Sequence, residues 1–344
     1  MSAAREATMG RSAPEILRWS RDLVDPALRV AVGELSGEMR AIAEYHFGWR
    51  DAAGRPAEAP AGKAVRPALA LLAAEAVGGG AADALPAAVA VELAHNFSLL
   101  HDDVMDGDLE RRHRPTAWAV FGANPAVLAG DALLACAVEG LAAATVGATA
   151  VAAFGRAVRE LVEGQSADVS FEERTDVTLA ECEAMAAKKT GALIGGACAL
   201  GAIFGGGDAE RTARLRRYGE LVGLAFQIMD DLLGIWGDPA VTGKPVHSDL
   251  VNRKKSLPVV AALTSGTSAG AALADLYHRA EPLAGADPAR AADLVERAGG
   301  RTWAAVRTAE LLAAAHAELA AVGPSGGTEA ELAAMARLLT DRDH

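Results

Sequence analysis

In two strongly apolar stretches of the chain the hydrophobic residues recur with helical spacing, and each stretch contains a pair of adjacent aspartates. The first spans residues 91–112 and reads VELAHNFSLLHDDVMDGDLERR. Asp102 and Asp106 are four residues apart, and Asp103 precedes Asp106 by three, so on a helix the three carboxylates converge. The face that this helix is expected to bury is formed by six apolar residues: Val91, Leu93, Ala94, Phe97, Leu99 and Leu100.

The second stretch, residues 221–250, presents the pair Asp230 and Asp231, followed by a loop that carries glycine and lysine. Clustered carboxylates repel one another, and oxygen ligands without a nearby cysteine favour a hard ion such as Mg²⁺. We expect the two helices to face each other across a cavity and to hold several Mg²⁺ ions, which would neutralise a leaving diphosphate. For the first stretch taken alone, a solvated acidic helix end is the alternative interpretation.

The N-terminal part of the chain also predicts helices. Ser12 followed by Pro14 is typical of a helix start. The helical pattern continues to about His46 and is interrupted near Asp25–Pro26. Residues 51–62 are rich in proline, glycine and alanine, which indicates a loop.

Later segments complete the expected architecture. Residues 115–170 predict two or three helices, and residues 257–344 predict several amphipathic helices separated by turns. Residues 1–11 are expected to be disordered. We therefore predict an all-α protein, with residues 12–344 as one domain of roughly ten or more helices around a central cavity.

Composition narrows the function further. Hydrophobic residues make up 51% of the chain but aromatic residues only 4%, so the core must consist mainly of alanine, leucine and valine, which favours close-packed helices. A net charge of −12 argues against nucleic acid as a partner. The three cysteines, Cys136, Cys182 and Cys198, lack metal or redox spacing and indicate reduced core residues of a cytoplasmic protein.

No targeting segment or membrane span is predicted. The N-terminus has no continuous apolar core of the signal-peptide type. Residues 140–155 and 191–206 are apolar but shorter than the roughly 20 residues that cross a bilayer, so we interpret both as buried core helices.

Basic residues mark candidate anion sites. Lys63 and Arg66 are three residues apart at the start of an apolar helix, and Lys189-Thr190 opens the apolar run 191–206. A cation pair of this kind is usually a solvated face. His95 lies about two helical turns before Asp102, where a single histidine on an apolar face is more often a core residue.

The sequence resembles the trans-isoprenyl diphosphate synthases. HDDVMDGDLERR is similar to the first aspartate-rich motif of that family and FQIMDDLLGIWGD to the second, and the resemblance runs from about Gly62 to Pro258. It implies a Mg²⁺-dependent enzyme that condenses isopentenyl diphosphate with an allylic diphosphate. By this resemblance the catalytic residues are Asp102, Asp103, Asp106, Lys189, Asp230 and Asp231, and the metal ligands are Asp102, Asp106 and Asp230.

The resemblance also implies which residues bind the two substrates. Isopentenyl diphosphate is assigned to Lys63, Arg66, His95 and Arg112. The allylic diphosphate is assigned to Arg111, Lys189, Thr190, Gln227, Lys244 and Lys254. Gln165 and Asp168 match a GQxxD pattern of the family, for which a polar surface turn is the alternative, and Lys188 is expected to be solvated.

The chain departs from the family pattern at two positions. His113 stands where glycine is usual, which leaves the path of that loop open. Gly234 stands where the second motif typically has a third aspartate, although Asp238 follows. The missing carboxylate is expected to weaken one metal site.

The helix that precedes Asp102 is expected to limit the length of the product. Phe97 lies five residues back, about 7.5 Å along the axis, where its ring would floor the cavity, while Ser98 leaves more room. In the family this pattern, without an insertion between the aspartates, belongs to one class of geranylgeranyl diphosphate synthase. We therefore expect a twenty-carbon product; ordinary core packing of Phe97 is the alternative.

Three other functions are compatible with part of the sequence pattern. A farnesyl or longer-chain synthase would share the chemistry. A class I terpene cyclase would have no use for Lys63 and Arg66, whereas a non-catalytic partner subunit of another synthase would explain Gly234. A homodimer is expected from the family alone.

Overall fold

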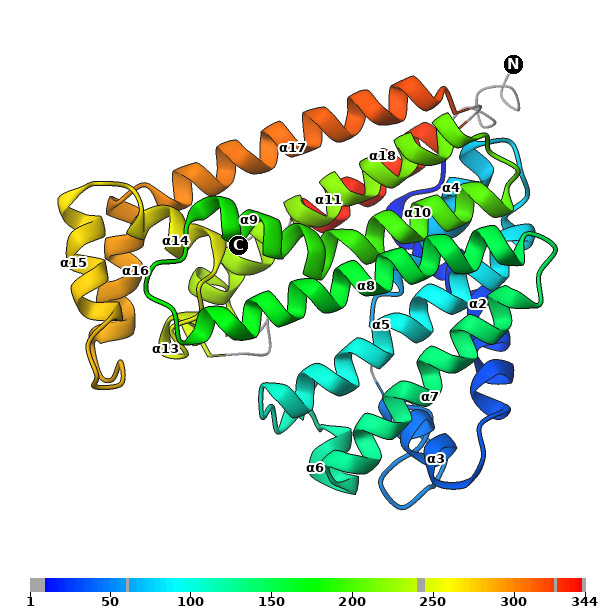
Figure 1. Ribbon diagram of the computed structural model, residues 1–344, viewed down its shortest axis with the longest axis horizontal. Coiled ribbons are helices and arrows are strands. Elements are labelled where there is room, and N and C mark those ends of the chain that lie inside the picture. The colour runs from blue at the N-terminus through cyan, green and yellow to red at the C-terminus, as the bar shows by residue number, and fades with distance from the viewer. Residues whose placement is uncertain (1–9, 60–61, 240–244, 325–326, 342–344) are drawn as a thin grey trace. The chain divides into compact units, whose positions relative to one another are not determined.

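The computed structural model describes residues 10–59, 62–239, 245–324 and 327–341 (Figure 1). It is all-α apart from one short hairpin within these residues, which confirms the predicted fold class. The helices in the N-terminal half are α2 Ala13–Gly33, α3 Gly37–His46, α4 Val65–Ala76, the 3₁₀ turn η1 Ala81–Ala84, α5 Leu85–Met105, α6 Ala117–Phe121, α7 Ala123–Ala142 and α8 Gly147–Glu172. The hairpin strands are β1 Glu110–Arg111 and β2 Arg114–Pro115.

The C-terminal half continues with helices only, within the described ranges. They are α9 Leu179–Ala186, the π-helical turn η2 Ala187–Gly191, α10 Ala192–Phe204, α11 Ala209–Trp236, α13 Ser248–Val251, α14 Leu257–Leu263, α15 Ser268–Tyr277, α16 Asp287–Arg297, α17 Gly300–Val322 and α18 Thr328–Thr340.

The chain forms two compact units that interleave along the sequence. Unit 1 comprises Met1–Val158, Gly196–Arg216 and Leu319–Met335; unit 2 comprises Arg159–Gly195, Arg217–Glu318 and Ala336–His344. Helices α8, α10, α11, α17 and α18 each contribute residues to both units. The single domain predicted over residues 12–344 stays a prediction.

Helix α2 begins as predicted but does not stop at Pro26. The Ser12 backbone N–H donates to the Glu15 carboxylate (2.8 Å), which closes a capping box at the helix start. Pro26 lies on the exposed side of the helix, where the carbonyl that loses its hydrogen bond can be hydrated. The predicted interruption at Asp25–Pro26 is therefore wrong, and the break comes after Gly33.

Of residues 1–11, which are expected to be disordered, the structure describes only Gly10 and Arg11, and the disorder stays a prediction. Residues 1–9 lie outside the described part of the chain, but Arg11 forms ion pairs with Glu75 (2.6 Å) and Glu331 (2.8 Å). Its guanidinium also lies 3.8 Å from the centre of the Trp19 ring. These contacts connect the start of α2 to α4 and α18 within unit 1.

Helix α5 is the central helix of unit 1. It packs against α2, α4 and α7, and Figure 1 shows α5 and α7 side by side. Ala87, Val91 and Leu100 are at most 1% exposed, so α5 is buried over most of its length. It ends at Met105, and Gly107 follows with a φ of +67°, a left-handed conformation that glycine adopts without steric cost.

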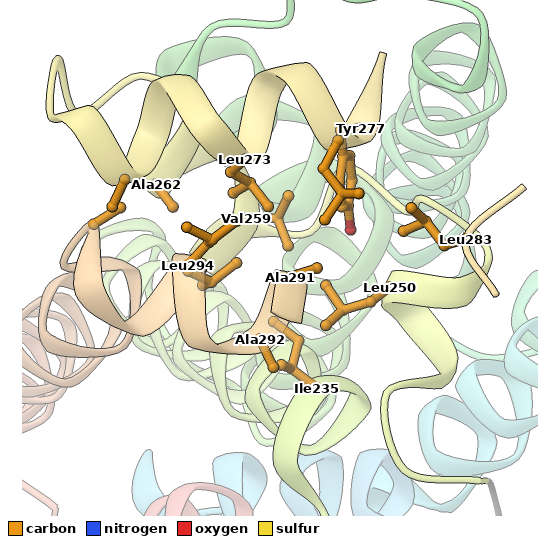
Figure 2. Close-up of a cluster of buried hydrophobic side chains, with 14 residues drawn as sticks. Ile235, Leu250, Val259, Ala262, Leu273, Tyr277, Leu283, Ala291, Ala292 and Leu294 are labelled. Carbon is orange, nitrogen blue, oxygen red and sulfur yellow. The ribbon is translucent and has the colours of Figure 1, made fainter. Parts of the chain in front are cut away.

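Unit 2 has its own apolar core at the end of α11. Figure 2 shows Ile235 of α11, Leu250 of α13, Val259 of α14, Leu273 of α15 and Leu294 of α16 meeting there. All five are at most 5% exposed. This cluster fixes α13 and α14 against the helix that carries Asp230 and Asp231.

One helix has the length and apolarity to cross a membrane, by composition alone, among the described residues. It is α7, and about a third of its apolar window is buried (33%). A second candidate appears only if α14 and α15, which meet at 116°, count as one broken span. Core helices often have this composition. The apolar run 191–206 corresponds to α10, whose side chains are almost all buried, as predicted.

Candidate active site

The predicted site residues fall into two sets, one in each unit. Unit 1 holds Lys63, Arg66, His95, Phe97, Ser98, Asp102, Asp103, Asp106, Arg111 and Arg112. Unit 2 holds Lys189, Thr190, Gln227, Asp230, Asp231 and Lys254. Lys244 lies outside the described residues. That both sets line one cavity stays a prediction, so each set is described by itself.

The three carboxylates at the end of α5 have different surroundings. Asp102 is partly exposed and Asp106 exposed, whereas the Asp103 side chain is 1% exposed. Arg111 Nε donates a hydrogen bond to Asp103 Oδ1 (2.7 Å), and Arg111 Nη2 forms an ion pair with the same oxygen (2.7 Å). Burial raises the pKa of Asp103, and the bond from Arg111 opposes that rise. Asp103 therefore orients Arg111, and Asp102 and Asp106 remain accessible from outside.

The acidic residues fit a magnesium ion that is shared with a substrate. In the described ranges, no group of three or more His, Cys, Asp and Glu side chains is placed to hold a metal ion by itself. Mg²⁺ commonly takes one or two carboxylates and completes its shell with water and phosphate oxygens. The partly exposed Asp102 and the exposed Asp106 match that donor set; the buried Asp103 does not.

A two-residue hairpin turn places the two arginines that follow α5. β1 pairs with β2 in antiparallel register, with Arg111 opposite Arg114, and the turn residues Arg112 and His113 have φ values of +53° and +61°. Two positive φ values are characteristic of a type I′ turn, in which glycine is favoured. This explains why glycine is usual at position 113, and it shows the loop path that the sequence left open.

Arg112 belongs to a cluster of buried charges around α5. A Cβ placed on Gly62 would lie 2.6 Å from Arg112 Nη2, so the guanidinium packs directly on the loop that carries Lys63. Burial lowers the pKa of Arg66 to about 10, and the nearby Glu92 carboxylate opposes this shift. Glu92 also favours the charged form of Arg112, whose pKa burial lowers. The side chains of Arg66 and Arg112 thus flank one carboxylate.

Two histidines border this cluster in their neutral form. Burial, followed by the charge of Arg112, lowers the pKa of His46 to about 3. Burial and then Arg66 lower the pKa of His95 well below its ordinary value. At neutral pH the imidazoles therefore act as hydrogen-bonding groups, and the positive charge belongs to the arginines.

The cluster is suited to an anion. Arg66 Nε is buried and has no hydrogen-bond partner among the described atoms. Glu92 faces both Arg66 and Arg112, and Asp103 also favours the charged form of Arg112. A diphosphate oxygen would supply an acceptor for an arginine that is buried and incompletely bonded.

The two predicted chain-length residues lie on the buried length of α5. Phe97 is 7% exposed, and its ring meets the His101 ring edge to face, with centroids 4.7 Å apart. A Cβ on Gly130 would lie 2.6 Å from His101, so α7 closes over this pair. The Ser98 hydroxyl donates to the His95 carbonyl (2.8 Å).

In unit 2, Lys189 and Thr190 lie on the π-helical turn η2. A turn of this kind is frequently found at functional sites. Lys189 forms an ion pair with Asp168 at 2.5 Å. A Cβ on Gly164 would lie 2.2 Å from the Lys189 backbone nitrogen, so this glycine permits the close approach of α8. Lys188 pairs with Glu163 at 2.8 Å and is about half exposed.

A chain of hydrogen bonds fixes the second aspartate pair. Thr190 Oγ1 donates to Gln227 Oε1 (2.5 Å), and Gln227 Nε2 donates to Asp231 Oδ1 (2.8 Å). The other carboxylate oxygen of Asp231 accepts the backbone N–H of Leu257 (2.8 Å), the first residue of α14. Burial raises the pKa of Asp231 to about 6. Asp231 therefore holds other groups in place, whereas Asp230 is exposed.

Lys254 is surrounded by carboxylates. Asp231, Asp249, Asp168 and Asp230 all favour its charged form, in that order, and together they overcome the cost of burial and raise its pKa. The Lys254 ammonium lies 3.9 Å from Asp249 Oδ2, and its backbone N–H donates to the Asp249 carbonyl (2.9 Å). The ammonium is thus placed among the acidic groups of unit 2.

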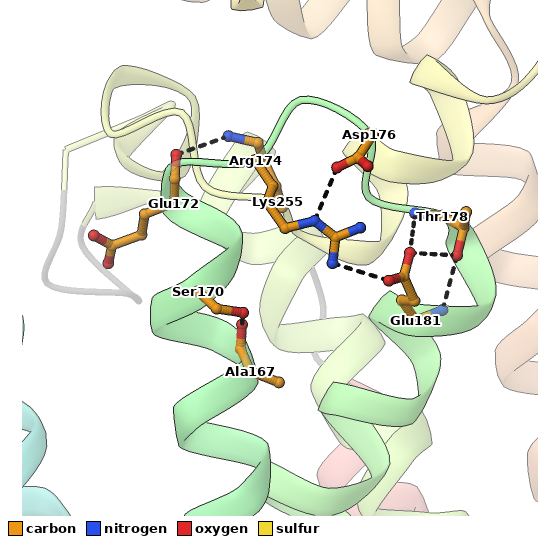
Figure 3. A network of polar contacts seen from close by, with 8 residues as sticks. All are labelled: Ala167, Ser170, Glu172, Arg174, Asp176, Thr178, Glu181 and Lys255. Atoms are coloured by element: carbon orange, nitrogen blue, oxygen red, sulfur yellow. Dashed lines mark hydrogen bonds and ion pairs between the residues drawn. The ribbon is translucent and has the colours of Figure 1, made fainter.

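Hydrogen bonds and ion pairs hold the connection between α8 and α9 next to the segment that carries Lys254. Figure 3 shows Arg174, just after α8, bridging Asp176 (2.8 Å) and Glu181 (2.9 Å), while Glu181 caps α9 through Thr178. Lys255 reaches the Glu172 carbonyl (3.4 Å). The connection between α8 and α9 is therefore fixed against the segment that follows Lys254.

Three residues that sequence reasoning missed or left open belong to these sets. Glu92 precedes His95 by three residues in an apolar helix, and a carboxylate inside such a run could have been recognised as buried. Asp168, which the sequence left undecided, holds Lys189. Asp249 lies on α13, at a distance along the chain from which no spacing rule would have placed it beside Lys254.

We expect Gln227→Leu to lower the free energy of unfolding by about 1–3 kcal/mol, because it leaves Thr190 and a buried oxygen of Asp231 without their partner. Urea unfolding measures this change. Thr190→Val is the matched control, since it keeps the bond from Gln227 to Asp231 and should cost less. Equal stability of Gln227→Leu and the unaltered protein would contradict the role of this chain of bonds.

The chain matches the sequence profile of one protein family, described as Polyprenyl synthetase, over residues 52–293. It is 45% identical over 340 residues to a (2E,6E)-farnesyl diphosphate synthase of Mycobacterium tuberculosis, a match that covers 97% of this chain and 94% of the relative. A geranylgeranyl diphosphate synthase of the same organism is 44% identical over 331 residues, with 95% and 93% covered.

Solved structures agree with these sequence matches. A polyprenyl synthetase from Streptomyces coelicolor A3(2) superimposes with a TM-score of 0.90 at 45% identity, covering 94% of this chain and 98% of that one. A geranylgeranyl pyrophosphate synthetase from Pyrococcus horikoshii superimposes with a TM-score of 0.85 at 32% identity, covering 96% and 99%. Both are similar to this chain over nearly its whole length.

Proposed function

The chain belongs to the polyprenyl synthetase family of trans-isoprenyl diphosphate synthases, and on this premise we propose that it condenses isopentenyl diphosphate with an allylic diphosphate to make geranylgeranyl diphosphate. The observation that supports the condensation most directly is the cluster around α5, in which Arg66 and Arg112 flank Glu92 and Arg66 Nε lacks a partner among the described atoms. A buried guanidinium that still has an unbonded donor suits a diphosphate oxygen.

The first half of the reaction separates charge. The bond between C1 of the allylic substrate and its diphosphate oxygen breaks, and the electron pair leaves with the diphosphate. Lys189, Thr190 and Lys254 bind the departing anion in this proposal. Mg²⁺, when bound at Asp102, Asp106 and Asp230, supplies further neutralisation of that charge.

The second half forms the new carbon–carbon bond. Lys63, Arg66, His95 and Arg112 hold the diphosphate of isopentenyl diphosphate so that its terminal double-bond carbon attacks the allylic C1. The attack leaves a positive charge on the other carbon of that double bond. A proton then leaves the CH₂ next to this cation for an oxygen of the released diphosphate, the C–H electron pair forms the new double bond, and the chain has grown by five carbons. Apolar walls exclude water, which would otherwise give an alcohol.

The product length is the finer part of the proposal. The farnesyl and geranylgeranyl relatives are almost equally identical to this chain, at 45% and 44%, so identity does not distinguish between them. The uninterrupted spacing from Asp102 to Asp106 and the aromatic ring of Phe97 support the twenty-carbon product. A farnesyl product, a longer product and a non-catalytic partner subunit are the alternatives.

The decisive experiment incubates the purified protein with Mg²⁺, isopentenyl diphosphate and allylic starters of five, ten and fifteen carbons in turn. We expect a twenty-carbon diphosphate. A product of another length would keep the chemistry and reject the length assignment. Failure to condense any starter would reject the proposed function and favour the partner subunit.

Phe97→Ala is expected to lengthen the product by one or more five-carbon units, because the ring closes the buried length of α5 against His101. Chromatography of the dephosphorylated products measures the change. Phe154→Ala, which removes a ring that is 1% exposed on α8, controls for a general loss of packing and should leave the product length unchanged. The same product from Phe97→Ala and the unaltered protein would reject Phe97 as the floor.

The proposal also includes a cytoplasmic homodimer, carried over from the family resemblance. Light scattering of the purified protein at several concentrations tests the assembly. A monomer that retains full activity would reject the dimer and leave the chemistry as proposed.

A further inference from the structure

The second aspartate motif lacks its third carboxylate at Gly234, and the space beside that glycine is occupied. A Cβ built on Gly234 would lie 2.2 Å from Asp249 Oδ2, 2.4 Å from Cγ and 2.9 Å from Oδ1. All three distances are below 3.0 Å, a separation that real Cβ atoms essentially never show. The Asp249 carboxylate therefore lies where a side chain at position 234 would begin.

Position 234 is on the same face of α11 as the aspartate pair. It follows Asp230 by four residues and Asp231 by three, which puts the three side chains next to one another on a helix. A carboxylate in contact with Gly234 is thus presented beside Asp230 and Asp231, although it comes from α13.

The electrostatics of unit 2 place Asp249 with the same acidic group. Asp249 raises the pKa of Asp231, and it is one of four carboxylates that favour the charged form of Lys254. Its side chain is 14% exposed, so it is largely withdrawn from solvent. Asp231 already uses both of its oxygens, on Gln227 and on the Leu257 backbone. Besides Asp230, Asp249 is therefore the carboxylate of this group that is placed to share an ion with a diphosphate.

We propose that Asp249 supplies the carboxylate which Gly234 leaves out of the second aspartate motif, and that it serves there with Asp230 toward Mg²⁺ and the substrate diphosphate. This inference rests on the proposed function. Glycine is required at position 234, because any side chain there would displace the Asp249 carboxylate. This role of Asp249 also removes the main sequence feature that favoured a non-catalytic partner subunit.

The test measures binding and not only turnover. Isothermal titration of Mg²⁺ into the protein with inorganic pyrophosphate gives the half-saturating Mg²⁺ concentration. We expect Asp249→Asn to raise it by about tenfold or more, the usual effect of losing a group that supports a metal site. Asp275→Asn, an exposed carboxylate on α15 of the same unit, should leave it unchanged.

Moving the carboxylate back to α11 gives a sharper test. Gly234→Asp alone should weaken Mg²⁺ binding, because its Cβ collides with the Asp249 carboxylate. The double variant Gly234→Asp with Asp249→Ala removes that collision and restores one carboxylate, so its half-saturation should return to within about threefold of the unaltered protein. Gly155→Ala, a helical glycine with nothing within 4 Å, is the control for losing a glycine.

The outcomes separate this inference from the function on which it rests. Unchanged Mg²⁺ binding by a folded Asp249→Asn, checked by circular dichroism, would overturn the role of Asp249 while the unaltered protein still condenses substrates. A double variant no better than Asp249→Asn would do the same. An unaltered protein that takes up no Mg²⁺ and pyrophosphate would overturn the proposed function, and this inference with it.

Discussion

Asp102→Ala is expected to reduce the rate of condensation by about a thousandfold, which corresponds to about 4 kcal/mol of lost transition-state stabilisation. Asp102 is partly exposed, and Asp106, the other accessible carboxylate of the first motif, lies four residues further on. Removing one of two carboxylates leaves the diphosphate with less neutralised charge as it departs. Steady-state rates at saturating substrate, measured over a range of Mg²⁺ concentrations, test this expectation.

The same variant should not lose stability. Like charges four residues apart on a helix destabilise it by a few tenths of a kcal/mol, so removing Asp102 should leave the free energy of unfolding unchanged or slightly higher. Asp108→Asn is the control, because it removes a carboxylate two residues beyond Asp106 and should keep the rate within about threefold. A rate for Asp102→Ala close to that of Asp108→Asn would contradict the assigned role.

Asp103→Ala, unlike Asp102→Ala, is expected to lose stability. We expect its free energy of unfolding to fall by about 3 kcal/mol. Asp103 is 1% exposed and accepts a hydrogen bond and an ion-pair contact from Arg111, so its removal leaves a largely buried guanidinium without its partner. The figure lies at the low end of the range for buried pairs because the Arg111 side chain is 28% exposed. Urea unfolding provides the measurement.

Two further variants check the cause of that loss. Asp103→Asn keeps an acceptor for Arg111 and should cost about 1–2 kcal/mol. Arg111→Met leaves the Asp103 carboxylate buried without its cation and should cost at least as much as Asp103→Asn. Stability of Asp103→Ala equal to that of the unaltered protein would show that the pair contributes nothing.

The sequence was informative wherever a short local pattern determines the structure. The start of α2 followed from Ser12 and Pro14, because capping involves neighbours within one turn. The buried length of α5 followed from its apolar spacing. The family and the all-α fold followed from motifs whose residues are close in the chain, since helices are built from local hydrogen bonds.

Local sequence patterns did not predict the backbone where its conformation depends on packing and pairing with distant segments. Pro26 was expected to interrupt α2, but its exposed side of the helix tolerates the lost hydrogen bond. His113 left the loop after α5 open, and only the pairing of β1 with β2 showed that a positive φ is required there. The sequence could not show that the pairing of the flanking strands holds His113 at a positive φ.

The aspartate pairs show the same division. The sequence by itself determined that Asp102-Asp103 and Asp230-Asp231 lie on two apolar helices, because spacing alone establishes this; in the structure each pair lies in the C-terminal part of its helix. Only the tertiary structure decided that the second member of each pair is buried and bonded, Asp103 to Arg111 and Asp231 to Gln227 and Leu257, while the first is more accessible. Adjacent residues on a helix point about 100° apart, so which one is covered depends on what packs against the helix.

Gly234 is the clearest case of what the chain order concealed. As a sequence it is a missing carboxylate; in the structure it is the space that admits Asp249 from α13. The sequence determined which chemical groups are available, and the packing of α13 against α11 decided which of them meet, because side-chain contacts between distant segments depend on the fold and not on spacing.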